Sequence, residues 1–213
     1  MNILQFTKLF FVQGGLFMYT ILIASIFGLA IMAERFYKVA FQFKVNPKAF
    51  MNKIFQHIKG NEFEQAIKLC DRSKAPLPLI IKAGLEKGNG SQSELQNAID
   101  EATLEQLPRI SRRIEYLSMV ANVSTLMGLL GTIWGLIQAF QAVSHADAAQ
   151  KATMLAGGIS MALNTTAFGL IVAVPCMISY SILNSLSDRI LDDIDEFSLK
   201  FINLMKSTRV EQP

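Results

Sequence analysis

The sequence has three long stretches without a single Asp, Glu, Lys or Arg, at residues 9 to 33, 116 to 144 and 152 to 187. Each exceeds the roughly 20 residues that a helix needs to cross about 30 Å of hydrocarbon. The 213-residue chain is also 51% hydrophobic, with a mean hydropathy of +0.33. These features exclude an ordinary soluble domain and predict three transmembrane helices. No small-residue cleavage site follows the first stretch, so we expect it to remain as an uncleaved span.

Cysteine and histidine are scarce. The chain has two cysteines, Cys70 and Cys176, which lie too far apart in sequence to suggest a metal site, and we expect both to be small buried residues. Its two histidines are His57 and His145. His145 and Asp147 could bind a metal, but a solvated loop is the favoured interpretation. We therefore expect no metal, no cofactor and no enzymatic activity.

Signals for strands and phosphate loops are missing as well. No stretch alternates between apolar and polar residues, so we expect almost no strand. The segment GLLGTIWG is rich in glycine, but it follows no strand and lacks the lysine of a Walker loop. The net charge of +3 is small and forms no basic face, which argues against nucleic-acid binding.

Basic residues are distributed unevenly between the connections. Lys and Arg number 14 in residues 34 to 115, whereas Lys8 alone precedes the first span and Lys151 alone lies between the second and third. By the positive-inside rule, residues 34 to 115 and the tail from Asp188 are cytoplasmic and the N-terminus lies outside. Most of the polar residues are therefore on the cytoplasmic side.

Capping signals divide the cytoplasmic loop into helices. Asn46 followed by Pro47 predicts one helix start, Asn61 with Glu64 a second, and Ser91 with Glu94 a third. From Ser91 the helical pattern runs into the second span, with a bend at Pro108. The expected divisions are 1–36 (N-terminal periplasmic segment and first span), 37–90 (cytoplasmic helical loop), 91–144 (long helix with the second span), 145–151 (periplasmic turn), 152–207 (third span with a cytoplasmic extension) and 208–213 (tail).

The extension of the third span has its own apolar pattern. Its apolar residues recur at spacings of 4, 3, 4 and 3, while acidic residues occupy the other faces. This heptad-like seam predicts that the helix projects from the membrane and packs on a neighbour. The seam consists of Ile190, Ile194, Phe197, Phe201 and Leu204.

Stripes of small residues run along the second and third spans. Such stripes let helix backbones approach closely in lipid, so close packing is the favoured interpretation, with Gly128, Gly135 and Gly169 as packing positions. The stripe on the second span contains Ser118, Ala121, Thr125, Gly128, Thr132, Gly135, Ala139 and Ala142, and that on the third contains Gly158, Ala162, Thr166, Gly169, Ala173 and Cys176.

Depth in the membrane suggests a second role for the hydroxyl groups. Thr132 and Thr166 lie 17 residues before and after Ala149, near the middle of the outer connection, so both are about 25 Å along their helices from it. Polar groups at that depth need a partner or water. We hypothesise that Thr132 and Thr166, supported by Thr165 and Thr125, line a pore.

Two further residues of the third span break its apolar pattern. Asn164 lies about 160° from Thr166 on a helical wheel, so we expect it to bond a neighbouring helix of its own or the next subunit. Pro175 cannot donate to the carbonyl of Ile171 and loosens the helix there, as a functional hinge or as a harmless kink. No ionisable residue lies within either span, so a proton relay would need an acid from a partner chain.

At these stripes the chain resembles the bacterial proton-channel stator family that includes ExbB, TolQ and MotA. The resembling segments are LMGLLGTIWGLIQAF at 126–140, ALNTTAFGLIVAVP at 162–175, GGLFMY at 14–19 and the Glu34-Arg35 pair after the first span. Three spans resemble the ExbB and TolQ branch, because flagellar stator proteins carry four.

The resemblance implies a homopentamer around two copies of a single-span ExbD- or TolR-like partner. It also implies that an aspartate of the partner carries protons past threonines matching Thr132 and Thr166. The resulting movement would act on a TonB- or TolA-like protein. Several relatives have a glutamate where this chain has Met161, which argues against a proton relay through the chain's own carboxylate.

We therefore expect an all-α membrane protein with three transmembrane helices, the second and third long and extending into the cytoplasm, and a small helical cytoplasmic loop domain. Its expected function is that of a pore-forming subunit in a proton-motive-force-driven stator complex of the inner membrane. The alternative is a non-conducting oligomeric scaffold that uses the small stripes only for packing.

Overall fold

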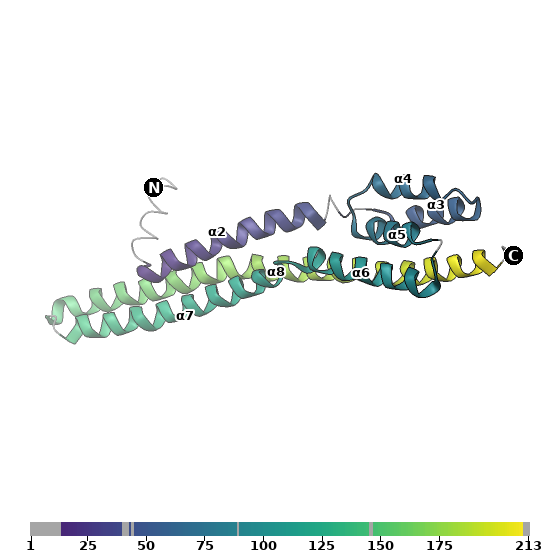
Figure 1. Cartoon of the computed structure of the whole chain (residues 1–213). Coiled ribbons are helices and arrows are strands. Elements are labelled where there is room, and N and C mark those ends of the chain that lie inside the picture. The colour runs from purple at the N-terminus through teal and green to yellow at the C-terminus, as the bar shows by residue number, and fades with distance from the viewer. Residues whose placement is uncertain (1–13, 40–42, 44, 89, 145–146, 211–213) are drawn as a thin grey trace. The chain divides into compact units, whose positions relative to one another are not determined.

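The computed structural model describes residues 14–39, 43, 45–88, 90–144 and 147–210. Residues 1–13 of the expected periplasmic segment, His145 in the outer turn and the end of the tail lie outside this part. Every regular element within it is a helix, and no strand occurs there, as predicted (Figure 1). The helices are α2 (Leu16–Tyr37), α3 (Pro47–Lys59), α4 (Phe63–Asp71), α5 (Pro76–Glu86), α6 (Gln92–Ser111), α7 (Glu115–Ser144) and α8 (Ala148–Val210).

The chain folds as two compact units. The membrane unit comprises residues 1–33 and 113–181, and the peripheral unit comprises residues 34–112 and 182–213. Within the described residues, three helical segments are long and apolar enough to cross a membrane, namely Leu16–Tyr37, Gln92–Ser144 and Ala149–Ser207. The prediction of an all-helical chain with three membrane-spanning segments is confirmed.

The second long segment is interrupted, although one continuous helix with a bend at Pro108 was expected. Pro108 lies inside α6, which ends only at Ser111, and α7 begins at Glu115. The break falls at Arg113, whose φ of 65° is left-handed. Pro108 deprives the carbonyl of Leu104 of a helical partner, but Leu104 is exposed, so the helix continues past the proline.

The peripheral unit is built around one apolar core. Residues of α3, α4, α5 and α6 pack there with the end of α8, whose Ile194 and Phe201 are almost fully buried. This confirms the heptad-like seam and shows that it packs within the chain. Gly84 on α5 permits the contact, because a Cβ at that position would lie 2.6 Å from Cε1 of Phe201.

Two of the three expected helix starts in this unit are confirmed. The Asn46 side chain accepts from the backbone N–H of Ala49, and Ser91 and Glu94 form a complete capping box. The start expected at Asn61 is wrong, because α4 begins at Phe63 and Asn61 has a φ of 59°. Asparagine tolerates this left-handed conformation, so here it ends a turn and does not cap a helix.

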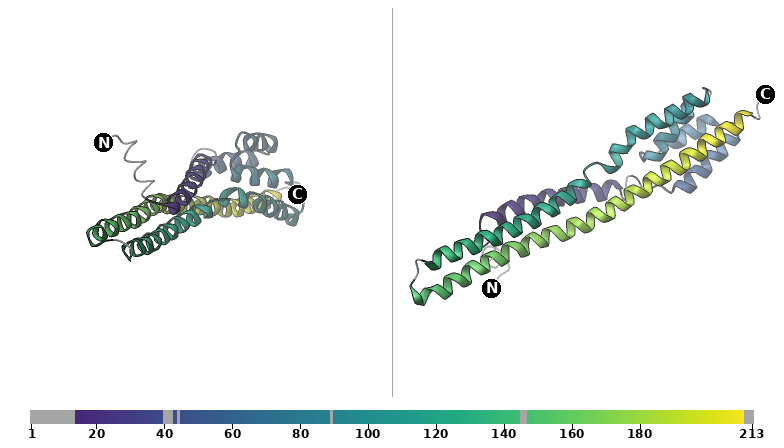
Figure 2. Two further views of the ribbon diagram at one scale, coloured as in Figure 1. Left: turned by 90° about the vertical axis from the view of Figure 1, so that its left-hand side faces the viewer. Right: turned by 90° about the horizontal axis from the view of Figure 1, so that it is seen from below.

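The membrane unit packs α2 against α7 and the first part of α8. Figure 2 shows α7 and the first half of α8 side by side and antiparallel. Gly28 on α2 allows close approach, since a Cβ there would lie 3.1 Å from Sγ of Cys176 and from Cγ1 of Val120. Cys176 is almost fully buried, as Cys70 is in the peripheral unit, in agreement with their predicted role as small buried residues.

Candidate functional site

The buried face of α7 is a stripe of small residues that differs in part from the predicted one. Gly128 and Gly135 are on it, as expected, but Ser124 and Gly131 take the central places expected for Thr125 and Thr132. Thr132 is half-buried and Thr125 is exposed in the single chain. The two threonines therefore lie at the edge of the contact with α8.

Backbones of α7 and α8 approach very closely along this stripe. A Cβ at Gly128 would lie 3.2 Å from Cα of Thr166, and one at Gly135 would lie 3.2 Å from Cβ of Ala162. At Gly169 an added Cβ would lie only 2.6 Å from the backbone oxygen of Ser124. Because neighbouring backbone cannot move aside as a side chain can, these positions accept only glycine without a shift of the helices.

Thr165 lies inside the chain, which corrects its expected place in the pore. Its side chain is fully buried, and its single hydroxyl proton lies within reach of two carbonyl acceptors, those of Gly14 (2.8 Å) and Met161 (2.9 Å). Gly131 faces it across the helix contact and leaves room for its methyl group. Thr165 therefore joins α7, α8 and the segment before α2.

The other three threonines of the expected pore also donate their hydroxyl protons to backbone carbonyls. Thr166 reaches across to Gly128 of α7 at 2.9 Å, whereas Thr132 and Thr125 bond within α7, to Leu129 (2.5 Å) and Ala121 (3.0 Å). Such bonds fix each hydroxyl and leave the lone pairs of its oxygen available as acceptors.

The depths of Thr132 and Thr166 follow from the pairing of the two helices. Gly131 faces Thr165, and the helices are antiparallel, so Thr132 lies one residue nearer the outer turn and Thr166 one residue farther from it. Two residues correspond to about 3 Å along a helix. The two hydroxyl groups therefore lie within one helical turn of each other.

The remaining expected site residues of α8 are more exposed. Asn164 and Met161 are half-buried, and the side chain of Asn164 has no hydrogen-bond partner among the described residues. The helix continues through Pro175, which is exposed. A bond from Asn164 to a neighbouring subunit and a hinge at Pro175 stay predictions.

Ser124 and Gly131 lie on the face of α7 that contacts α8, although the predicted stripe of small residues did not include them. The glycines of GLLGTIWG, at 128, 131 and 135, are spaced by three and four residues, and that spacing alone would have placed Gly131 on the contact face. Ser124 gave no such signal. It is fully buried, and its hydroxyl has no hydrogen-bond partner in the described part of the chain.

The membrane unit thus presents a glycine-rich helix pair with threonine hydroxyls at its edge. The second charge-free run starts at Tyr116 on α7, and the third, residues 152 to 187, lies within α8. A comparison with protein families matches residues 72–196 to the MotA/TolQ/ExbB proton channel family. The chain belongs to this family. The match covers α7 and most of α8, including every threonine discussed above.

Named relatives of this MotA/TolQ/ExbB family member fall in the ExbB and TolQ branch. A biopolymer transport protein, ExbB-like 3 of Synechocystis sp., is 29% identical over 174 residues, which cover 81% of this chain and 82% of that protein. The biopolymer transport protein exbB1 of Vibrio cholerae is 27% identical, covering 90% and 85%. The Tol-Pal system protein TolQ of Haemophilus influenzae is 35% identical over 108 residues, covering 51% and 47%.

A solved structure agrees with the fold. The structure of MotAB from C. jejuni aligns with a TM-score of 0.62 at 16% sequence identity, covering 91% of this chain and 77% of that one. At this identity the likeness concerns the fold alone.

Proposed function

We propose that this chain is the pore-forming subunit of a stator complex that the proton-motive force drives. Membership of a proton channel family supports this function. The observation that carries the proposal is the pair of hydroxyls on Thr132 and Thr166, within one turn of each other in spans that contain no Asp, Glu, Lys, Arg or His. Thr125 extends the same polar edge one or two turns farther along α7.

The lack of charged residues in the second and third spans supports a complex in which a partner chain supplies the proton-binding group. A proton crossing the membrane needs a group that can bind and release it, and the second and third charge-free runs contain no Asp, Glu, His, Lys or Arg to do so. The family resemblance implies that Met161 stands where several relatives carry a glutamate. We propose that a single-span, ExbD- or TolR-like partner supplies a carboxyl group, and that this chain forms a homopentamer around it.

The threonine hydroxyls can serve both protonation states of such a carboxyl group. Each hydroxyl oxygen can accept a hydrogen bond from the protonated acid, and after rotation its proton can be donated to the carboxylate. As the helices move, the partner's carboxyl group would pass from the threonine hydroxyls of one subunit to those of the next. One proton moving through 100 mV releases about 2.3 kcal/mol, so useful work requires repeated steps.

The charge distribution of the loops supports the orientation. Residues 34 to 115, which carry 14 Lys and Arg residues, would be cytoplasmic, with the C-terminus on the same side and the N-terminus in the periplasm. The inner membrane is the expected location, and a TonB- or TolA-like protein is the expected recipient of the motion.

A non-conducting scaffold is the second candidate. The close contacts at Gly128, Gly135 and Gly169 favour it, because they need no ion flow to explain them. In a scaffold the hydroxyls of Thr132 and Thr166 would have no task beyond their bonds to backbone carbonyls.

Isosteric substitution separates the two functions. Thr132→Val and Thr166→Val should each reduce proton flux at least tenfold in liposomes that hold the chain with its partner, while native mass spectrometry shows an unchanged oligomer. Thr20→Val is the matched control, because Thr20 is an exposed threonine on α2 that bonds within its own helix, to Phe17. Normal flux in both pore variants would favour the scaffold.

A further inference from the structure

The peripheral unit contains a cavity with basic walls. Its volume is about 470 Å³. Five of the side chains that line it are cationic, and none is acidic. The cationic residues are Arg35, Lys38, Lys74, Arg109 and Arg112.

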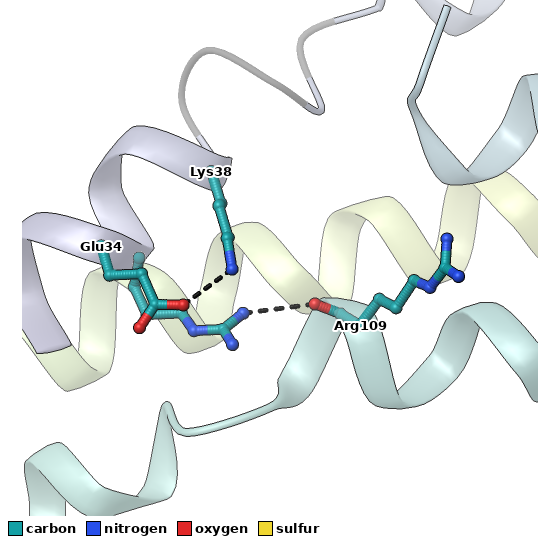
Figure 3. A network of polar contacts seen from close by, with 4 residues as sticks. Glu34, Lys38 and Arg109 are labelled. Carbon is teal, nitrogen blue, oxygen red and sulfur yellow. Dashed lines mark hydrogen bonds and ion pairs between the residues drawn. The ribbon is translucent and has the colours of Figure 1, made fainter.

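Nearby carboxylates neutralise only part of this charge. Glu34 pairs with Lys38 at 2.7 Å, and Glu105 pairs with Arg109 at 3.5 Å (Figure 3 shows the first pair). Lys74 has no carboxylate partner among the described residues. The lining itself carries five cationic side chains and no carboxylate, which favours an anionic ligand.

Arg35 forms a buried and fixed part of the cavity wall. Its side chain is only 1% exposed, and its Nη1 donates to the backbone carbonyl of Arg109 at 3.2 Å. This bond appears in Figure 3 as the dashed line that ends at Arg109. Gln106, 5% exposed, adds a neutral amide to the lining. Long basic side chains on a solvated surface move freely, whereas this buried guanidinium is held in place.

The sequence sets this cavity at a membrane boundary. Arg35 comes two residues after Ala33, where the first charge-free run ends, and Arg112 comes four residues before Tyr116, where the second begins. Residues that directly flank membrane spans are expected at the level of the phospholipid headgroups. Phe43 and Leu79 also line the cavity and offer apolar contact beside the charges.

We propose that this cavity binds the phosphate of an anionic phospholipid headgroup from the adjacent leaflet. Basic pockets at the ends of membrane helices attract such headgroups, at about 1 kcal/mol for each Lys or Arg near the surface. Inorganic phosphate shares the binding chemistry, but it would gain nothing from Phe43, from Leu79 or from the nearness of the bilayer. A lipid held here ties the end of α2 to the end of α6.

The site is tested on the purified full-length chain by native mass spectrometry and by thermal unfolding in detergent. The probes are phosphatidylglycerol, phosphatidylcholine and inorganic phosphate. Lys74→Gln combined with Arg112→Gln removes two exposed cations from the lining, so the fold should persist. Lys53→Gln combined with Lys206→Gln is the control, because it changes the net charge equally at exposed positions outside the cavity.

The wild-type chain should retain phosphatidylglycerol at least tenfold better than phosphatidylcholine. The cavity variant should bind phosphatidylglycerol about 10- to 30-fold more weakly, and the control variant should bind it normally. A variant with Lys74→Arg and Arg112→Lys keeps both charges and should also bind it normally. Equal losses in the cavity and control variants would overturn the proposal, since they indicate general charge attraction. Displacement of the lipid by millimolar inorganic phosphate would also overturn it, in favour of a soluble ligand.

Discussion

The hydroxyl of Thr165 donates to the carbonyl of Gly14 at 2.8 Å, although 151 positions separate the two residues. The bond ties α8 to the segment that leads into α2. In lipid there is no water to replace such a partner, so the bond matters more than one at a wet surface. Thr165 and Thr166 are neighbours in sequence, yet the Thr165 side chain is fully buried within the membrane unit, whereas Thr166 is only half-buried, at the edge of the helix pair.

Removal of the Thr165 hydroxyl should therefore destabilise the chain. Thr165→Val keeps the shape but leaves the Gly14 carbonyl without this donor, and we expect a loss of about 1–2 kcal/mol in the free energy of unfolding. Thermal unfolding in detergent measures it, with Thr20→Val as a control that should change stability by less than about 0.5 kcal/mol. An unchanged melting temperature for Thr165→Val would show that the bond contributes nothing.

Two glycines of α8 should respond in opposite ways to the same substitution. Gly169→Ala drives a Cβ to within 2.6 Å of the Ser124 carbonyl oxygen, so the helices must separate and stability should fall by about 1–3 kcal/mol. A Cβ at Gly157 meets nothing within 4 Å, and Gly157→Ala should be neutral or slightly stabilising through its gain in helix propensity. The comparison requires unfolding curves of both variants, and equal curves would refute close packing at Gly169.

Cys70 should be an unreactive thiol in the folded protein. Burial, and to a lesser extent the charge of Asp71, raises its pKa from 9.0 to about 12, against a smaller opposing effect of Lys82. Thiolate is the reactive form, so at pH 8 iodoacetamide should modify Cys70 at least tenfold more slowly in the native chain than in the denatured one. A Cys176→Ser background isolates the signal, and rapid native labelling would contradict the buried environment.

The raised pKa of Cys70 also makes stability depend on pH. The folded thiol stays protonated where the unfolded one ionises, so the stabilising contribution is complete below about pH 9 and is lost as pH rises toward 12. Between pH 8 and 10.5 the free energy of unfolding should fall more steeply in the wild type than in Cys70→Ala. Parallel slopes would show that the thiol has no shifted pKa.

The capping box of α6 should make its own contribution to the free energy of unfolding. Ser91 accepts from the N–H of Glu94, and the carboxylate of Glu94 accepts from the N–H of Ser91 at 2.6 Å. Ser91→Ala should cost about 1 kcal/mol of stability in denaturant unfolding. Ser207→Ala is the control, because Ser207 is an exposed serine whose hydroxyl bonds within α8, to the carbonyl of Leu204. A cost no larger than that of the control would mean that the box is not stabilising.

Sequence reasoning succeeded wherever a local rule had no competitor. Charge-free runs longer than a bilayer core, the caps at Asn46 and Ser91, and the seam through Ile194 and Phe201 all appear in the structure as expected. It failed at Asn61 and at Pro108, where two outcomes are locally allowed. Asparagine can cap a helix or adopt a left-handed φ, and a proline can end a helix or be tolerated when the carbonyl it frees is solvated.

The sequence by itself determined the three spans and the absence of Asp, Glu, Lys, Arg and His within the second and third runs, because composition encodes these directly. Only the tertiary structure decided that Thr165 is buried, that Gly131 faces it, and that Arg35 and Lys74 line one cavity. A stripe of period 3.6 is about 100° wide, so adjacent residues such as Thr165 and Thr166 both fit it. The partner helix, and not the period, selects which of them turns inward.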